Sequence, residues 1–395
     1  MSRRPALLPL LTAALLAVLP GCRRDRPPEG STSGPQSTAL VSPCTGPAGP
    51  GLAVARWDGT RTVVSLLAAP DFEASRPCAV VEGPVRGLAA AATSSLFAWT
   101  DHEVLRLAAK TAAGGADPPA AQRLWTTAGQ VICVTPASPP RAPRSGALLI
   151  LTADRLEGGR PLGAHLYLLL PSSGREPRLL SPEPTYNFWD VSVGNVDGDG
   201  AEDVALCTWS YTARDPEYAR RFFVYGWDRD GDLYPRWRGS RLSRPYVAAR
   251  LLTVAPGRPA CLVSVELAPD GGRLVATYGW NQFGFRGTGH TPVYRDLTLP
   301  QPGDLGGDGR VELVSVETDQ TGTRRPCVFG WSAPVGAEGA VALRPLWVGG
   351  PLGPGQQVVV VPGPWALLAV YDPATGRARM LRAGLQEVNW ALRGR

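Results

Sequence analysis

The sequence predicts an all-β fold, a β-propeller of about seven four-stranded blades, and three observations support this prediction. First, an aromatic residue followed by Gly-Trp recurs about every 50 residues, at Tyr225-Gly-Trp227, Tyr278-Gly-Trp280 and Phe329-Gly-Trp331. Second, each repeat has room for four short runs of apolar, β-branched and aromatic residues, as one propeller blade requires. Third, no helical stripe of useful length follows the first 50 residues, whereas 46 glycines and 40 prolines suit many strands joined by turns.

Strands can be assigned in order within the three clear repeats. They are expected at 191–193, 204–208, 222–225 and up to Trp237; at 248–254, 261–265, 274–278 and up to Tyr294; and near Leu297, at 311–316, at 327–329 and up to Trp347. Four weaker units contain a strand, a turn and a second strand, beginning at Ala53, Leu96, Leu148 and Leu367. Counting these units gives seven blades, and six or eight remain possible. The repeated aromatic residues are expected to pack between neighbouring blades, since large aromatic side chains dominate buried area.

An acidic loop lies between two of these strands, at Asn195-Val-Asp-Gly-Asp-Gly-Ala-Glu-Asp203. Calcium takes six to eight oxygen ligands, and this loop offers side-chain oxygens from Asn195, Asp197, Asp199 and Asp203 at positions 1, 3, 5 and 9. Gly200 permits a sharp turn, and the carbonyl of Ala201 is the expected fifth ligand. Strands flank the loop, which argues against an EF-hand. The alternative is a solvated hairpin turn that binds no metal.

This loop resembles the calcium loop of FG-GAP/VCBS repeats, which occur in integrin α-subunit propellers and in many secreted bacterial proteins. A second, weaker copy is identified at 304–312, where Asp304, Asp308 and Glu312 keep their places but Gly306 replaces the third-position carboxylate. The resemblance implies a propeller stabilised by structural Ca²⁺. By contrast, Asp228-Arg-Asp-Gly-Asp232 is interpreted as a hairpin turn, because Asp-Gly favours tight turns and Arg236 stands at the ninth position.

The N-terminus predicts export and lipidation. Residues 1–21 combine Arg3-Arg4 with an apolar run too short to span a bilayer comfortably, as in a signal peptide. Leu19-Pro-Gly-Cys22 resembles the bacterial lipobox, although Pro20 is unusual there, and this resemblance implies a lipid on Cys22. The alternative is an uncleaved anchor with an incidental cysteine. Residues 22–50 are rich in Pro, Gly, Ser and Thr and are expected to form a disordered tether, followed by a single propeller domain over 51–395.

Charge and cysteine content are consistent with an exported protein. The net charge of +6 does not indicate a nucleic-acid partner, because the basic residues are spread along the chain. The expected location is the bacterial cell envelope, lipid-anchored and facing the periplasm or the exterior, with an outer membrane or cell surface preferred. Six cysteines remain beside Cys22, and either a Cys44–Cys78 disulfide or unpaired buried cysteines are expected.

No linear catalytic motif was found, and the three histidines, His102, His165 and His290, lack metal-ligand spacing. We therefore expect a monomeric, non-catalytic binding scaffold for a protein or glycan partner. The alternative is an extracytoplasmic propeller enzyme, such as a lyase, hydrolase or quinoprotein, with its site in the axial channel. Converging carboxylates and an arginine on the axis would favour that enzyme.

Overall fold

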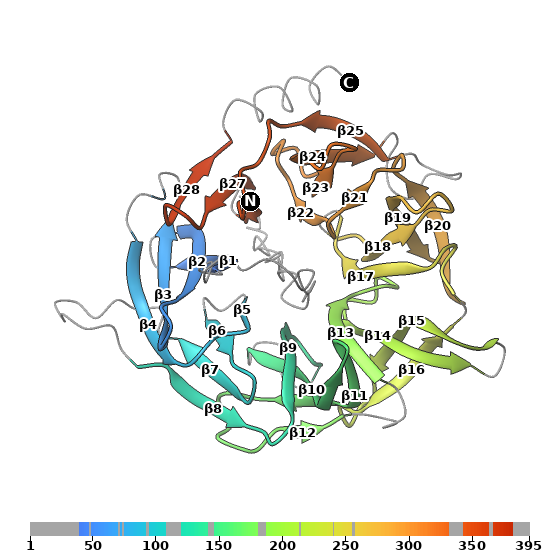
Figure 1. Cartoon of the computed structure of the whole chain (residues 1–395). Coiled ribbons are helices and arrows are strands. Elements are labelled where there is room, and N and C mark those ends of the chain that lie inside the picture. Colours follow the sequence, from blue (N-terminus) through green and yellow to red (C-terminus); the bar gives the residue numbers. More distant parts are fainter. Residues whose placement is uncertain are drawn as a thin grey trace, which may run out of the picture.

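Short apolar runs separated by turns form 28 strands in the described residues, and the computed structural model arranges them in a ring of seven antiparallel sheets (Figure 1). This confirms the predicted all-β propeller and its seven blades. The structure describes residues 39–46, 49–69, 72, 75–91, 95–107, 120–140, 146–180, 187–212, 215–239, 241–254, 257–331, 343–362 and 366–381. Within these ranges the chain forms no helix of the length and apolarity needed to cross a bilayer.

Each blade is an antiparallel meander whose strands pair in chain order. Blades 1 to 3 contain β1 (Ala39–Gly46), β2 (Gly49–Trp57), β3 (Arg61–Ala68) and β4 (Ser75–Glu82); β5 (Gly87–Ala90), β6 (Leu96–Trp99), β7 (Glu103–Leu107) and β8 (Gln122–Thr126); and β9 (Gln130–Ala137), β10 (Ala147–Glu157), β11 (Arg160–Leu169) and β12 (Arg178–Leu179). Blades 4 and 5 contain β13 (Asn187–Gly194), β14 (Asp203–Thr212), β15 (Asp215–Trp227) and β16 (Leu233–Arg238); and β17 (Tyr246–Leu252), β18 (Cys261–Leu267), β19 (Arg273–Trp280) and β20 (Phe285–His290). In blade 6 the first strand is split into β21 (Asp296–Leu297) and β22 (Gln301–Gly303), followed by β23 (Glu312–Thr318), β24 (Arg324–Trp331) and β25 (Leu343–Val348). Blade 7 has three described strands, β26 (Gln357–Val361), β27 (Leu367–Asp372) and β28 (Arg377–Met380).

The first strands of the blades surround the axis, and the last strands lie on the outside (Figure 1). Apolar side chains fill the space between neighbouring blades, so most strands are buried on both faces. Blades 4 and 5 share a cluster that includes Phe222 and Leu262. The ring closes where Val41 of β1 packs in one cluster with Val361 of β26 and Tyr371 of β27. Stacking the blades therefore buries apolar faces that a single sheet would leave in water.

The aromatic residues of the repeated Gly-Trp segments lie between blades, as predicted. Tyr225, Tyr278 and Phe329 are buried, and each belongs to a cluster shared with a neighbouring blade. A β-bulge precedes each segment: the pairing of the third and fourth strands shifts just before these aromatic residues. The bulge leaves one extra residue on the fourth strand, whose side chain lies over the glycine of the segment, in the pairs Arg236 over Gly226, Thr288 over Gly279, and Leu346 over Gly330.

The predicted boundary between tether and propeller is wrong. β1 (Ala39–Gly46) falls inside the 22–50 segment and pairs along its whole length with β2. Ala39, Val41 and Cys44 are buried, so this short apolar run supplies the inner strand of blade 1 despite the Pro-, Gly- and Ser-rich sequence around it. The predicted signal peptide at 1–21, the predicted lipidation residue Cys22 and positions 23–38 and 47–48 of the expected tether lie outside the described residues, whereas Gly49 and Pro50 begin β2.

Two smaller expectations also differ from the structure. The fourth strand of blade 5 ends at His290, and Tyr294 forms only an isolated bridge with Arg273. Cys44 and Cys78 do not form the preferred disulfide: both keep buried thiols, which confirms the alternative for this pair. Both thiols belong to the apolar cluster shared by blades 1 and 2, where cysteine acts as a small apolar side chain.

Candidate functional site

The acidic loop connects β13 to β14 at one end of blade 4, and its own side chains fold it. Asn195 Oδ1 accepts the Gly198 N–H at 2.7 Å, and Asp199 Oδ1 accepts the Ala201 N–H at 2.8 Å. Asp203 Oδ2 accepts the N–H of buried Val196 at 3.0 Å. These bonds hold the turn while leaving the second oxygen of each aspartate to other partners.

One further oxygen of each of three aspartates, Asp197, Asp199 and Asp203, lies at the guanidinium of Arg236, whereas Glu202 of the same loop accepts the Ser138 N–H. The guanidinium hydrogen-bonds to Asp197 Oδ2, lies 3.2 Å from Asp199 Oδ2, and places Nε 2.9 Å from Asp203 Oδ1. The Asp203 side chain is 1% exposed and that of Arg236 is 16% exposed, so these charges are largely removed from water. The loop therefore has a cation, and the chain itself supplies it.

Burial and charge act in opposite directions on the loop's carboxyl groups. Burial raises the pKa of Asp203 to about 6, although the Val196 N–H and Arg236 favour its ionised form. Burial also opposes ionisation of Asp197, yet hydrogen bonds from Arg236 and the Asp199 N–H hold its pKa below the usual value. Burial alone would lower the pKa of Arg236, but Asp197 and Asp203 raise it above its ordinary value. Arg236 thus keeps its charge and offsets much of the repulsion among the three aspartates.

The second acidic loop joins β22 to β23 and uses its carboxylates differently. Both oxygens of Asp304 accept backbone N–H groups, those of Gly307, Asp308 and Gly309. Glu312 Oε2 accepts the Leu305 N–H at 3.0 Å, as Asp203 does from Val196 in the first loop. Burial raises the pKa of Glu312 to about 7. This loop is closed by backbone donors, so fewer of its oxygens are left for a metal.

The structure brings Asp197, Asp199 and Asp203 together at Arg236, while Asn195 Oδ1 and the Ala201 N–H take part in the hydrogen bonds of the turn. In the described part of the chain, no three His, Cys, Asp or Glu side chains are arranged about a metal-sized centre, because the first loop is arranged about a guanidinium. The chemistry of the donors suits calcium, since three carboxylate oxygens not used by the turn contact the same guanidinium. A calcium ion there requires Arg236 to leave.

Sequence reasoning missed the role of Arg236, which it considered only as a failed ninth ligand in 228–236. The Asp228 segment itself is a turn, as predicted: Asp228 Oδ1 accepts the N–H groups of Asp230 and Asp232 between β15 and β16. The sequence signal for Arg236 was the glycine of Tyr225-Gly-Trp227, over which a long side chain of the fourth strand can pass.

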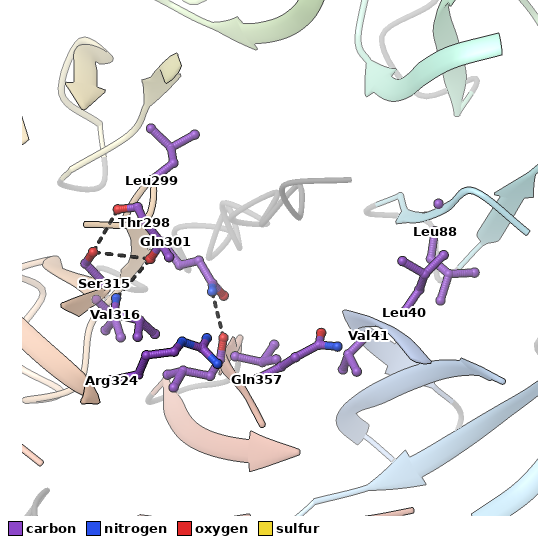
Figure 2. Close-up of a pocket in the computed structure, with 14 residues that line it drawn as sticks. Leu40, Val41, Leu88, Thr298, Leu299, Gln301, Ser315, Val316, Arg324 and Gln357 are labelled. Carbon is purple, nitrogen blue, oxygen red and sulfur yellow. Dashed lines mark hydrogen bonds between the residues drawn. The ribbon is translucent and has the colours of Figure 1, made fainter. Parts of the chain in front are cut away.

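A cavity of about 170 Å³ opens between the first strands of blades 1, 2 and 7 and the first three strands of blade 6 (Figure 2). Apolar side chains such as Leu40, Leu88 and Leu299 line much of it. Its polar side chains largely bridge neighbouring strands: Gln301 Nε2 donates to the Val358 carbonyl at 2.9 Å, and Gln357 Nε2 donates to the Ala39 carbonyl at 2.7 Å. Arg324 is the charged residue among the described lining residues, and no carboxylate joins it there.

A ladder of aromatic and arginine side chains lies on blades 3 and 4, and sequence reasoning did not find it. The Arg220 guanidinium lies 5.7 Å from the Trp189 ring centroid and 5.1 Å from that of Trp209. Arg160 lies 5.1 Å from Trp209 and 4.5 Å from Tyr218. Trp209 and Tyr218 stack with an interplanar angle of 14°. Cations over aromatic faces stabilise such an arrangement and hold its members in fixed orientations.

No protein-family model matches the chain, and no curated protein matches it. Solved structures that are similar to it at low sequence identity include the following two. The crystal structure of BBS1N in complex with ARL6DN, soaked with lead, has a TM-score of 0.49 and 10% identity, covering 87% of this chain and 91% of that one. AofleA from Arthrobotrys oligospora has a TM-score of 0.37 and 13% identity, covering 80% of this chain and 88% of that one. Neither likeness assigns a function to this chain.

Proposed function

We propose that this protein is a lipid-anchored extracytoplasmic component of a bacterial envelope whose propeller is a non-catalytic binding scaffold for a protein or glycan partner. In this proposal Cys22 carries the lipid, the blades are of the FG-GAP/VCBS type, and calcium binds the loop at 195–203. The observation that carries the scaffold role is the aromatic and arginine ladder of blades 3 and 4.

The ladder has the properties of a recognition surface. Two tyrosines of the β14–β15 hairpin are turned toward solvent, Tyr211 with 64% and Tyr218 with 40% of its surface exposed. Tyrosine, tryptophan and arginine are enriched at the energetic centres of interfaces, since they offer large contact areas and polar atoms. The stacking already fixes the orientation of Tyr218, so binding a partner loses less side-chain entropy there. Aromatic faces also stack against sugar rings, which supports a glycan equally well.

The axial cavity gives less support to the alternative, an enzyme acting in the channel. General acid and base catalysis needs titratable groups within hydrogen-bond reach of a substrate. The described lining offers Arg324 alone among charged residues, and its amides Gln301 and Gln357 are engaged in holding strands together. This arrangement suits packing of the ring better than proton transfer.

The scaffold role can be tested by photo-crosslinking in the native envelope. We expect a photoreactive amino acid at Tyr211 or Tyr218 to give a discrete adduct, whereas the same group at Val348, 44% exposed on blade 6, gives none. A glycan array on the purified full chain separates a sugar partner from a protein. Adducts of equal yield at all three positions, with no glycan bound, would exclude this face as the binding surface.

Lipid anchoring has its own test. In the same cells, Cys22→Ser should release the protein from the membrane fraction, and unchanged fractionation contradicts lipid anchoring.

A further inference from the structure

We propose that Arg236 is a tethered cation that occupies the 195–203 loop without calcium and that calcium must displace in order to bind. This inference rests on the proposed calcium binding and specifies what controls it. Arg236 therefore sets the calcium affinity of the loop and keeps the loop closed when the ion is scarce.

The bulge in blade 4 aims Arg236 at the loop. Tyr225 pairs with Pro235 and Val224 pairs with Trp237, so Arg236 is the extra residue of β16. Bulges commonly redirect one side chain in this way. The guanidinium then crosses β15 above Gly226, where a Cβ would lie only 2.5 Å from Arg236 Nε. The bulge in β16 and the absence of a side chain at Gly226 together allow the Arg236 guanidinium to reach the three aspartates.

The contacts of Arg236 are the contacts that a metal would need. Asp197 Oδ2, Asp199 Oδ2 and Asp203 Oδ1 are the oxygens left over by the turn, and all three face the guanidinium. Two cations cannot share this point, because their mutual repulsion in a partly buried site is strong. Since Arg236 is attached to the same blade, it competes at a high effective concentration. The apparent affinity for calcium equals the affinity of the open loop multiplied by the fraction of molecules in which Arg236 has left the loop.

Blade 6 supplies an internal comparison. Its fourth strand has the same bulge, with Phe329 paired to Pro345 and Val328 paired to Trp347. The extra residue there is Leu346, which lies over Gly330 and brings no charge to the 304–312 loop. In that loop the backbone N–H groups bond to Asp304 instead. The same backbone geometry therefore accommodates leucine in blade 6 where blade 4 has arginine, so Arg236→Leu introduces no steric conflict there.

The loop also connects two blades, which gives its occupancy a structural consequence. The Asn195 carbonyl accepts the N–H of Ala260 in blade 5 at 2.6 Å, and Asp203 holds Val196, which packs in the cluster shared with blade 5. A loop whose three aspartates repel one another loosens this junction. Either Arg236 or calcium prevents that repulsion.

The test compares the full-length wild type with Arg236→Leu, with Arg344→Leu on the equivalent strand of blade 6 as control. Calcium chloride is titrated by calorimetry, and thermal unfolding is followed with calcium and with a chelator. Arg236→Leu should bind calcium at least about tenfold more tightly than the wild type. Its unfolding midpoint should fall in chelator and recover in calcium, while Arg344→Leu behaves as the wild type. Arg236→Gln replaces the leucine variant if that variant does not fold in either buffer.

The outcomes separate this inference from the calcium proposal on which it rests. Equal calcium affinity of the wild type and Arg236→Leu overturns competition and leaves calcium binding in place. Binding by the variant alone supports the inference, with Arg236 then excluding calcium from the native protein. An absence of calcium binding and of any calcium-dependent midpoint in both proteins overturns calcium at this loop altogether.

Discussion

At the scale of single residues, buried charges in the propeller are mostly matched by nearby partners. Arg221 is fully buried and donates to the Asp215 carboxylate and to backbone carbonyls of the same hairpin. Asp190 and Arg250 form a buried ion pair between blades 4 and 5, with Arg250 Nε 3.1 Å from Asp190 Oδ2. Burying such a pair costs desolvation free energy, but each charge keeps its partner. Replacing one member therefore lowers the stability of the fold more than replacing both by apolar residues.

Glu266 is less well matched and yields a pH-dependent prediction. It is fully buried in β18; Tyr278 and Ser264 donate to its Oε1, while its Oε2 lies 3.6 Å from Arg244. Burial raises the pKa of Glu266, although these partners favour the ionised form. A raised folded-state pKa stabilises the protein at low pH, and this contribution is lost as pH rises through that pKa.

We therefore expect Glu266→Gln to be more stable than the wild type at pH 7–8 and to lose that advantage as the pH falls toward the ordinary pKa of glutamate, about 4. Denaturant unfolding at several pH values measures this difference. A variant that is less stable at pH 8 would instead show that the pairing of ionised Glu266 with Arg244 stabilises the fold.

At the scale of elements, the repeats were predictable because each aromatic-Gly-Trp segment ends an apolar third strand, and two strands precede it at regular spacing. The acidic loop was predictable from its oxygen spacing. The bulge on the fourth strand was not, because it depends on the register between strands and leaves no periodic pattern. Arg236 could therefore be placed near the loop only once the register of β15 and β16 was known. β1 was missed because the composition around Ala39 resembles that of a tether. Its strand character becomes evident only from its pairing with the adjacent strand β2.

The glycines under the bulges lead to a prediction that compares two blades. A Cβ at Gly330 would lie 2.5 Å from Leu346 Cδ1 and 3.0 Å from its Cγ, whereas one at Gly279 meets only Thr288 Cγ2 at 3.3 Å. Overfilling a packed site typically costs about 1–3 kcal/mol. We expect Gly330→Ala to lower the free energy of unfolding within that range and Gly279→Ala to cost clearly less. Denaturant midpoints measure both, and equal losses would mean that the bulged side chains move aside freely.

At the scale of the whole molecule, the described residues of blade 7 and blade 1 close the ring by apolar packing and by a side-chain hydrogen bond, and similar bonds join blade 6 to blade 7. Gln357 of β26 donates to the Ala39 carbonyl of β1, and Gln301 of β22 bonds to β26 at both the Val358 carbonyl and the Val360 N–H. These glutamines explain the polar part of the axial cavity. They connect consecutive inner strands in place of backbone pairing between blades.

We expect Gln357→Ala to cost about 1 kcal/mol, the usual contribution of one hydrogen bond. Hydrogen exchange should rise in β1 and β26 and stay unchanged in β13, which lies across the ring. Gln301→Ala, which loses two bonds, is the matched variant and should cost more. Unchanged exchange in β1 would show that apolar packing alone holds the seam.

The bond from Gln357 to Ala39 spans 318 positions of the chain, which affects how the protein is made. Synthesis proceeds from the N-terminus, so blade 1 emerges long before blade 7. Until the last blade arrives, Val41 and Leu52 lack the neighbours Val361 and Tyr371 that bury them in the finished ring. The nascent protein thus exposes the apolar face of blade 1 until blade 7 has been made, and holdase chaperones that bind unfolded chains would protect it from aggregation. Premature stop codons before blade 7 should accordingly yield aggregates and proteolytic fragments in place of a smaller ring.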